Sequence, residues 1–241
     1  MPIDISRSML VESSEKLAKQ YGSKITITAQ HGTYNQAMEY IHQQYSSQSK
    51  LIMFLGSSLG NFHRPDAISF IQSLTKCMNP MDKLLLGVDL RKKKEILEPA
   101  YDDALGVTAK FNLNLLKRIN NELNGNFDME NFQHEAKYDE IDGYIRMFLK
   151  SKKDQEVYIG AINRTISFKE NEVIHTENSV KYSLLELDTL AYASDLFIEH
   201  FWMDKNEKFS LSLLSPLVTK SPKYFQQILS NGWSFSDKIF G

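Results

Sequence analysis

The first ninety residues alternate apolar runs with amphipathic stretches, and this alternation constrains the fold more than any other feature of the chain. Runs typical of strands occur at 1–6, 24–30, 51–56 and 82–90. Apolar residues at helical spacing fill the intervals at 8–21, 34–45 and 64–78. The order β-α-β-α-β-α-β with short links predicts an α/β fold with a doubly wound sheet, and the apolar run at 51–56 predicts a fully buried strand.

All four predicted strands end in small or polar residues. These ends are Asp4-Ile5-Ser6, Gly32-Thr33-Tyr34, Gly56-Ser57-Ser58 and Asp89-Leu90. In doubly wound sheets, ligands bind beyond the carboxyl ends of the strands. The pattern therefore predicts a nucleotide-cofactor site at this end of the sheet.

The rhythm changes from residue 92 to about residue 181. Helical spacing continues to about Asn131, and the segments that then follow predict an antiparallel meander at 144–151, 156–162 and 164–170. A helix at 183–194 and a hairpin across the turn at 205–207 are predicted next. We therefore expect a core of residues 1–91 and 182–217, an inserted α+β substrate-binding lobe at 92–181, and a C-terminal extension at 218–241.

Charge and cysteine content argue against several classes of function. The formal net charge is −2 and the basic run at 91–94 is short, so we predict a solvated loop and no nucleic-acid partner. The six histidines lack the spacing of metal ligands, so no metal site is predicted. Cys77 is the only cysteine, which fits a reducing cytoplasm, and no apolar run reaches the length of a membrane span.

Five motifs together resemble a known family. In chain order they are "FLGSSLGNF", "LLLGVDL", "AYDDALGVTAKFNLNLL", "FDMENFQHEA" and "TENSVKY". Over residues 2 to about 217 the chain resembles the histidine-specific, S-adenosylmethionine-dependent Nα-methyltransferases of ergothioneine biosynthesis. The resemblance implies a class I methyltransferase-like fold and S-adenosylmethionine as cofactor. It also implies L-histidine as substrate, methylated on its α-amine towards trimethylhistidine (hercynine).

The resemblance implies that the cofactor binds at the ends of the predicted strands. Asp4 would accept hydrogen bonds from the ribose hydroxyls, although an Asp here is also typical of a turn or a helix cap. Thr33 and Tyr34 match the segment that contacts adenine, where bacterial relatives often carry Asp-Phe. Gly56 and Ser58 match the loop where the backbone passes close to the cofactor.

The same resemblance implies a site for the amino-acid end of the substrate. Asn61 would bind this end through its amide, and capping of the next helix is the alternative. Tyr101 would bind the substrate carboxylate, whereas without the resemblance it is interpreted as a core or interface aromatic. Phe111 would face the methylated ammonium in a cation–π contact. The polar segment that enters this helix is therefore interpreted as the roof of an amino-acid pocket.

The stretch "HTENSVKY" carries the expected specificity for histidine. Glu177 and Ser179 are two residues apart on an extended segment, so both side chains are expected on one face. A carboxylate and a hydroxyl would then bind the two imidazole nitrogens, and an apolar substrate would leave them unpaired. Met147 matches the family's apolar wall against the ring.

No catalytic residue follows from the sequence. Methyl transfer from a sulfonium to an amine needs neither a metal nor a covalent enzyme intermediate, so the protein aligns the reactants and stabilises charge. The amine must be deprotonated before it reacts, and the sequence does not identify the group that accepts the proton.

The family has a further N-terminal segment that precedes the position of Met1. It includes the first, central strand and a Gly-rich acidic loop around the methionine part of the cofactor. Without that strand, the strands at 2–5 and 51–55 would each expose an unpaired edge. We then expect poor solubility or association through the gap, with a second copy or a complementary N-terminal chain, and weak cofactor binding.

Three explanations for this difference from the family stay open. They are a start site upstream or a partial chain, a split enzyme completed by another chain, and a remnant without activity. The alternative function is therefore an inactive remnant or a subunit that only binds a ligand or a partner chain.

Overall fold

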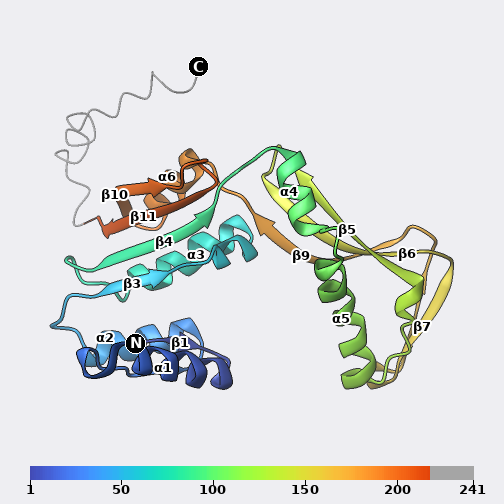
Figure 1. Cartoon of the computed structure of the whole chain (residues 1–241), viewed down its shortest axis with the longest axis horizontal. Coiled ribbons are helices and arrows are strands. Elements are labelled where there is room, and N and C mark those ends of the chain that lie inside the picture. The colour runs from blue at the N-terminus through green and yellow to red at the C-terminus, as the bar shows by residue number, and fades with distance from the viewer. Residues whose placement is uncertain (218–241) are drawn as a thin grey trace, which may run out of the picture.

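The structure, a computed structural model, describes residues 1–217. The helices are α1 (Arg7–Tyr21), α2 (Tyr34–Gln44), α3 (Arg64–Thr75), α4 (Lys94–Tyr101), α5 (Val107–Leu123) and α6 (Leu184–Ala193). The strands are β1 (Ile3–Asp4), β2 (Gln30–His31), β3 (Leu51–Phe54), β4 (Lys83–Asp89), β5 (Phe132–Asp139), β6 (Tyr144–Ser151), β7 (Gln155–Ile159), β8 (Arg164–Phe168), β9 (Val173–Val180), β10 (Leu196–Met203) and β11 (Phe209–Pro216). Figure 1 shows a core that contains β3, β4, β10 and β11, and beside it a lobe that contains α4, α5 and β5–β9.

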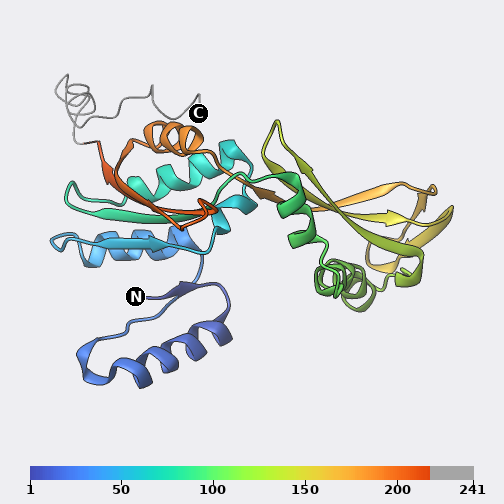
Figure 2. The same ribbon diagram turned by 45° about the horizontal axis from the view of Figure 1, so that its top comes forward.

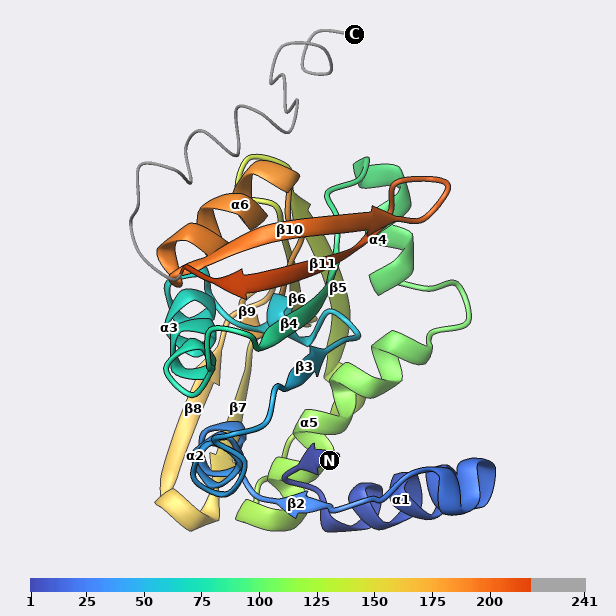
Figure 3. The same ribbon diagram turned by 90° about the vertical axis from the view of Figure 1, so that its left-hand side faces the viewer.

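The core is built on a four-stranded sheet in the order β10–β11–β4–β3. β3 and β4 run parallel, whereas β11 is antiparallel to both β4 and β10. Figure 3 shows these strands following one another through a twisted sheet, with α3 and α6 on one side. The predicted α/β fold and the predicted closing hairpin are therefore confirmed.

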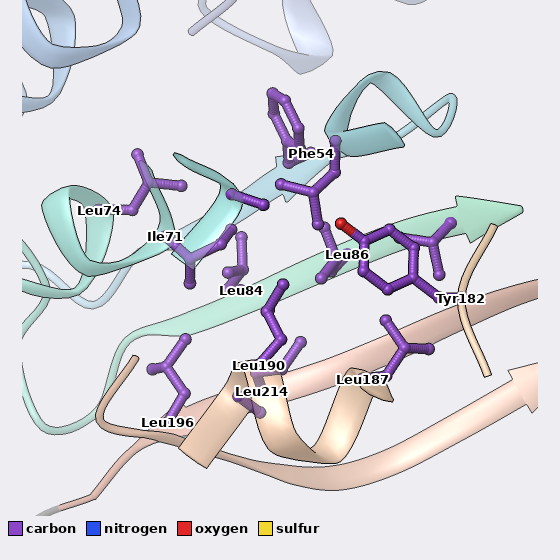
Figure 4. Packing of buried hydrophobic residues seen from close by; sticks show 14 of the residues in the cluster. Phe54, Ile71, Leu74, Leu84, Leu86, Tyr182, Leu187, Leu190, Leu196 and Leu214 are labelled. Atoms are coloured by element: carbon purple, nitrogen blue, oxygen red, sulfur yellow. The ribbon is translucent and has the colours of Figure 1, made fainter. Parts of the chain in front are cut away.

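Strand β4 crosses the middle of this sheet and is deeply buried. Leu84, Leu86 and Val88 are at most 1% exposed, and they share one apolar cluster with Ile71 of α3 and Leu190 of α6 (Figure 4). Burial of each such side chain contributes roughly 1.5–3 kcal/mol to stability. The cluster therefore fixes the position of β4, and with it the position of the strand's polar carboxyl end.

Strands β1 and β2 form a separate parallel pair that is not hydrogen-bonded to the four-stranded sheet. Figures 2 and 3 both show this pair, with α1 and α2, beyond the β3 side of the sheet. The predicted strand at 24–30 is wrong for most of its length, since only its last residue, Gln30, lies in β2. Because β1 offers just two residues for pairing, the alternating run before Gln30 has no ladder to join.

The prediction that 51–56 forms a fully buried strand is also wrong. Leu51 and Met53 are 57% and 59% exposed, whereas Ile52 and Phe54 pack against the core cluster. Within residues 1–217, β3 is paired with β4 alone, so its second edge is open. An open edge with exposed apolar side chains can pair with a further strand.

The lobe contains the three-stranded antiparallel sheet β5–β6–β9 and the separate hairpin β7–β8. The predicted strands are confirmed at β6, β7 and β8, but the predicted meander is wrong, because β6 pairs with β5 and β9 whereas β7 pairs with β8. Strand β5 was not predicted. Its buried residues Phe132, Ala136 and Tyr138 follow a period of two, and the charged and polar residues between them obscure the strand signal. Leu116 of α5 packs with Phe132 in a core cluster of the lobe's own.

The predicted domain division, with its boundaries at 91/92 and 181/182, stays a prediction. The predicted extension at 218–241 lies outside the described residues. Across the described part of the chain, no helix combines the length and apolar character needed to span a membrane.

Candidate active site

A cavity of about 360 Å³ opens where the carboxyl ends of β3 and β4 meet the lobe. Its lining residues are Gly56, Ser57, Ser58, Asn61, Asp89, Tyr101, Ser179, Lys181 and Phe209. The cavity thus brings together five of the residues that the sequence singled out, which come from segments far apart in the chain: Gly56, Ser58, Asn61, Tyr101 and Ser179. Strand ends and the lobe together form the site.

The loop after β3 is held against β4 by its own backbone and one hydroxyl. Gly56 and Ser57 both adopt positive φ, at 79° and 62°. The Ser57 hydroxyl accepts a hydrogen bond from the backbone N–H of Asp89 at 2.9 Å. Asn61 ends the short 3₁₀ helix that follows, and α3 begins only after His63, with no side-chain cap. The capping alternative for Asn61 is therefore not what the structure shows.

Lys181 is a buried cation at the lobe end of the cavity. Its side chain is 1% exposed, and its Nζ donates to the Tyr101 hydroxyl at 2.7 Å and to Ser179 Oγ at 3.0 Å. Nζ also forms an ion pair with Asp89 Oδ2 at 2.7 Å. The two hydroxyls, of Tyr101 and Ser179, lie 2.9 Å apart. The four side chains therefore form one closed hydrogen-bonded cluster, which we call the Lys181 cluster.

Tyr101 is also held through its backbone. The Asn112 amide donates to His134 Nδ1 at 2.9 Å, so that ring nitrogen is an acceptor and Nε2 carries the proton. His134 Nε2 then donates to the backbone carbonyl of Tyr101 at 2.7 Å. Asn112 is buried, which makes this chain of hydrogen bonds a structural support for the end of α4.

The entrance of α5 is polar mainly because the helix needs a cap. Asp103 accepts hydrogen bonds from the backbone N–H groups of Thr108 at 2.7 Å and Val107 at 2.9 Å. The hydrogen bonds from Thr108, and then the one from Val107, lower the pKa of the Asp103 carboxyl to about 2. Of the predicted roof of the amino-acid pocket, Tyr101 lines the cavity, whereas Asp103 caps a helix and Phe111 is 66% exposed outside the lining.

Met147 and Glu177 lie directly opposite each other on β6 and β9. Side chains at paired positions share a face of the sheet, and Ser179 follows Glu177 on that face. Met147 is buried in a cluster against which Tyr101 packs. The Glu177 carboxylate has no hydrogen-bond partner among residues 1–217, and neither residue belongs to the cavity lining. The two residues flank the Lys181 cluster along the same sheet face.

The three residues expected around the nucleoside lie on the β1–β2 pair and α2. Asp4 Oδ1 accepts a hydrogen bond from the Ser6 backbone at 2.7 Å, which is the turn interaction of the alternative interpretation. The Thr33 side chain caps α2 in a reciprocal capping box with Gln36. Tyr34 is 41% exposed, with its ring 5.5 Å from that of Phe54 on β3. None of these three residues lines the cavity.

The whole described chain matches one protein family. Residues 1–216 match the family model described as "Histidine-specific methyltransferase, SAM-dependent" (SAM, S-adenosylmethionine). This chain belongs to that family. The resemblance inferred from the five sequence motifs is thereby confirmed.

Relatives of this family member have names that refer to histidine, to ergothioneine biosynthesis and to tryptophan. The histidine N-alpha-methyltransferase of Mycobacterium tuberculosis is 35% identical over 88% of this chain and 65% of that protein. Ergothioneine biosynthesis protein 1 of Schizosaccharomyces pombe is 36% identical over 55% of this chain and 17% of that protein. The L-tryptophan methyltransferase trpM of Psilocybe serbica is 28% identical over 91% of this chain and 63% of that protein. The chain thus spans less than two thirds of the length of its M. tuberculosis relative.

The family description implies S-adenosylmethionine, and the end of β3 fits such a group. A Cβ built on Gly56 would meet no atom within 4 Å, so open space adjoins the backbone at the point where the chain turns with positive φ. Any residue other than glycine at position 56 would place its side chain in this space. Around it, Ser57, Ser58 and Asn61 provide polar groups without bulk.

Sequence reasoning did not single out Ser57, Asp89, Lys181 and Phe209 as site residues. A signal for Lys181 was present, because it continues the period-two series of Glu177 and Ser179 in "TENSVKY". Asp89 was recognised as a strand end but was given no partner. The pairing of Asp89 with Lys181 depends on the lobe folding back onto β4, and local sequence does not encode that contact.

Proposed function

We propose that this chain is an S-adenosylmethionine-dependent methyltransferase that methylates the α-amino group of L-histidine, with N,N,N-trimethylhistidine (hercynine) as the eventual product. Family membership supports the reaction class, and the similarity to the histidine N-alpha-methyltransferase of M. tuberculosis supports histidine. The observation that carries the proposal is the convergence of Asn61, Tyr101 and Ser179 on one cavity beside the open loop at Gly56.

The residues of this chain would divide the substrate between them. Asn61 and Tyr101 would bind the amino acid's backbone end, and Ser179 with Glu177 would bind the imidazole nitrogens. Met147 would form the apolar wall beside the ring, and Phe111 would approach the methylated ammonium only after a movement of α5, since it lies exposed outside the cavity. In this scheme the protein aligns the amine and supplies no covalent intermediate.

S-adenosylmethionine would supply the electrophilic methyl group when bound. Gly56 and Ser58 would adjoin it at the end of β3, while Asp4, Thr33 and Tyr34 would contact the nucleoside from the β1–β2 side. For Asp4 the free oxygen is Oδ2, because Oδ1 already accepts from Ser6. Location in the cytoplasm stays a prediction from the single cysteine.

Methyl transfer to a panel of amino acids tests the proposal. The 241-residue chain is incubated with labelled cofactor and L-histidine, L-tryptophan, L-tyrosine or L-phenylalanine. We expect label in histidine above all others. Strong transfer to tryptophan with none to histidine would contradict the proposed specificity and would place the chain with the tryptophan-methylating relative.

The open edge of β3 favours a second candidate function, that of a subunit completed by another chain. β3 is paired on one side only, and the β1–β2 pair lies beyond its free edge (Figure 3). An extended apolar segment that ran parallel to β3 would pair with this edge and cover Leu51 and Met53. In this case the chain alone binds ligand without turnover.

Complementation separates the two candidates. Methyl transfer is measured with the chain alone and after addition of a family member's first-strand segment, supplied as a separate polypeptide. Activity that appears only in the mixture supports the subunit, and full activity of the chain alone supports the complete enzyme. A chain that binds histidine but stays inactive in both assays would support the remnant.

A further inference from the structure

Phe209 contributes an aromatic ring to the core side of the cavity. It is the first residue of β11 and lies directly opposite Asp89, the last residue of β4. Side chains at paired positions share a face of the sheet, so the ring lies on the same face as the Asp89 carboxylate. The backbone N–H of Phe209 donates to Asp204 Oδ1 at 2.8 Å, which holds the start of β11 in the hairpin turn.

The Phe209 ring lies against the bare backbone of Gly87. A Cβ built on Gly87 would lie 3.1 Å from Phe209 Cζ and 3.2 Å from Cε1, closer than ordinary van der Waals contact, so any larger residue would displace the ring. The Gly87 carbonyl also accepts a hydrogen bond from the backbone N–H of Ser57 at 3.2 Å. The ring therefore lies beside the loop after β3, where Gly56 adjoins open space.

The two aromatic residues of the cavity lining, Phe209 and Tyr101, differ in what faces their rings. Lys181 Nζ lies 4.7 Å from the centre of the Tyr101 ring, so that ring already has a cation. Within residues 1–217, no side-chain cation lies over the Phe209 ring. An aromatic face attracts a cation, most strongly where water is excluded. Phe209 therefore offers an aromatic face that is free to receive a cation from a ligand.

The charged side chains near this ring balance one another. Asp89 pairs with both Lys181 and Lys92, and Glu177 flanks the Lys181 cluster. Two ammonium groups and two carboxylates leave no excess charge, so together they neither attract nor repel a cationic ligand strongly. The free face of Phe209 is then the feature that separates a cationic ligand from a neutral ligand of the same shape.

We propose that Phe209 binds the positively charged sulfur of S-adenosylmethionine through a cation–π contact, and so distinguishes the methyl donor from its demethylated product. The inference rests on the proposed function, since it takes S-adenosylmethionine as the cofactor. The ring and Gly56 both lie on the core side, where the cofactor is proposed to bind, whereas Tyr101 lies on the lobe side. S-adenosylhomocysteine has the same adenosyl and amino-acid parts but a neutral sulfur, so the ring face contributes little to its binding.

The test compares the affinities for S-adenosylmethionine and S-adenosylhomocysteine. Because we expect weak cofactor binding, both ligands are titrated calorimetrically up to millimolar concentrations, into the 241-residue chain and into F209L, F209Y and W202L. F209L replaces the ring by an apolar side chain that has no π face. It should weaken the binding of S-adenosylmethionine by roughly 3- to 30-fold more than that of S-adenosylhomocysteine.

Two further variants separate cation binding from a merely structural role. F209Y keeps an aromatic face, and we expect it to keep the wild-type ratio of the two affinities within about 2-fold. W202L removes an exposed aromatic ring of β10 that lies outside the cavity lining, and the ratio should again stay at its wild-type value. A structural role alone would weaken both ligands equally in F209L.

The outcomes distinguish this inference from the proposed function. Equal weakening of the two ligands in F209L, or the same change of ratio in F209Y as in F209L, would overturn the role of Phe209 and leave the function standing. Should F209L fail to fold, F209M repeats the comparison with a second apolar side chain that has no ring. A wild-type chain that binds neither ligand overturns the proposed function together with the inference.

Discussion

The lobe side of the cavity and the β1–β2 strand pair, on which the two halves of the proposed site lie, are held in different ways. On the lobe side, Tyr101, Ser179 and Lys181 are hydrogen-bonded to one another, and Lys181 is also paired with Asp89 at the end of β4. On the strand-pair side, the side chains of Asp4 and Thr33 bond to their own turn and helix, and within residues 1–217 the β1–β2 pair shares no ladder with β3. The proposed amino-acid half of the site is therefore pre-organised, whereas the position of the proposed nucleoside half is not set by strand pairing.

The largest effect is expected at Gly143, in the turn between β5 and β6, because its backbone packs closely against Arg91 and Lys181. Its φ is +71°, and a Cβ there would lie 2.8 Å from Arg91 Cζ and from the Lys181 carbonyl oxygen. Gly143→Ala should therefore lower the free energy of unfolding by roughly 2–5 kcal/mol, through strain and overpacking together. Chemical denaturation measures this change.

Gly106→Ala is the matched control for Gly143→Ala. Gly106 has a similar φ of +67° but no atom within 4 Å of the added Cβ. Gly106→Ala should therefore lower the free energy of unfolding by only about 1 kcal/mol, the cost of backbone strain. Equal losses in the two variants would contradict close packing of the turn against Arg91 and Lys181.

The second largest effect is expected at Glu177, which tests whether the lobe side recognises the imidazole. Glu177→Ala should weaken L-histidine binding by roughly 1.5–3 kcal/mol, the range of a charge-assisted hydrogen bond, and leave cofactor binding nearly intact. Asn178→Ala is the control, since Asn178 pairs with Arg146 on the opposite face of the sheet. Calorimetry that showed cofactor binding lost and histidine binding unchanged would refute the assignment.

A smaller effect is expected at Glu186, which joins the lobe to the core. The carboxylate accepts hydrogen bonds from Arg64 and Arg91, and Arg91 also donates to the carbonyls of Glu140 and Ile141 in the lobe. Burial raises the pKa of Glu186, but the hydrogen bond from Arg91 and the nearby charges lower it more, so the pKa lies below its ordinary value of 4.5. Glu186→Gln should cost about 1–3 kcal/mol at neutral pH.

The contribution of Glu186 to the free energy of unfolding depends on pH. Because the folded-state pKa of Glu186 is depressed, its stabilisation is complete above the unfolded value near 4.5 and is lost as the pH falls through the lower folded value. Glu186→Gln should therefore be destabilising at neutral pH and nearly neutral in strong acid, measured by denaturation at several pH values. Glu122→Gln, in an exposed pair with Arg118, should leave the stability nearly unchanged at every pH, because solvent screens the pair.

The smallest effect on stability is expected on the strand-pair side, at the free edge of β3. Because Leu51 and Met53 are exposed, the double variant L51K/M53K should change the free energy of unfolding by less than about 0.5 kcal/mol. It should nevertheless reduce self-association in sedimentation velocity, since charges block edge pairing. L105K/I141K places the same two charges on exposed positions of the lobe as a control. Association that persists in L51K/M53K would show that copies meet elsewhere.

Local patterns in the sequence predicted most of the fold. Helical spacing closed by Gly22 predicted α1, and the apolar run at 82–90 predicted β4. The errors lie where tertiary context overrides a local pattern. Residues 25–29 alternate like a strand but pair with no strand among residues 1–217, and Leu51 and Met53 are apolar yet exposed.

The site was predictable only in part, for the same reason. Family resemblance pointed to Tyr101 and Ser179, and the structure places both at the cavity without testing their roles. Lys181 could be found from its period-two spacing, but its three partners come from β4, α4 and β9. The partners of the buried Lys181 ammonium come together only after the lobe has folded, so the local sequence does not indicate them.

Calorimetric titration of L-histidine and of S-adenosylmethionine into the same preparation of the 241-residue chain shows which half of the proposed site is pre-organised. The pre-organised lobe side predicts measurable binding of L-histidine by the chain alone. Because the strand pair shares no ladder with β3, we expect the cofactor to bind far more weakly than it binds to the M. tuberculosis relative. Micromolar cofactor affinity in a monomeric chain that does not bind L-histidine would contradict this, because the nucleoside half would then be pre-organised and the amino-acid half would not.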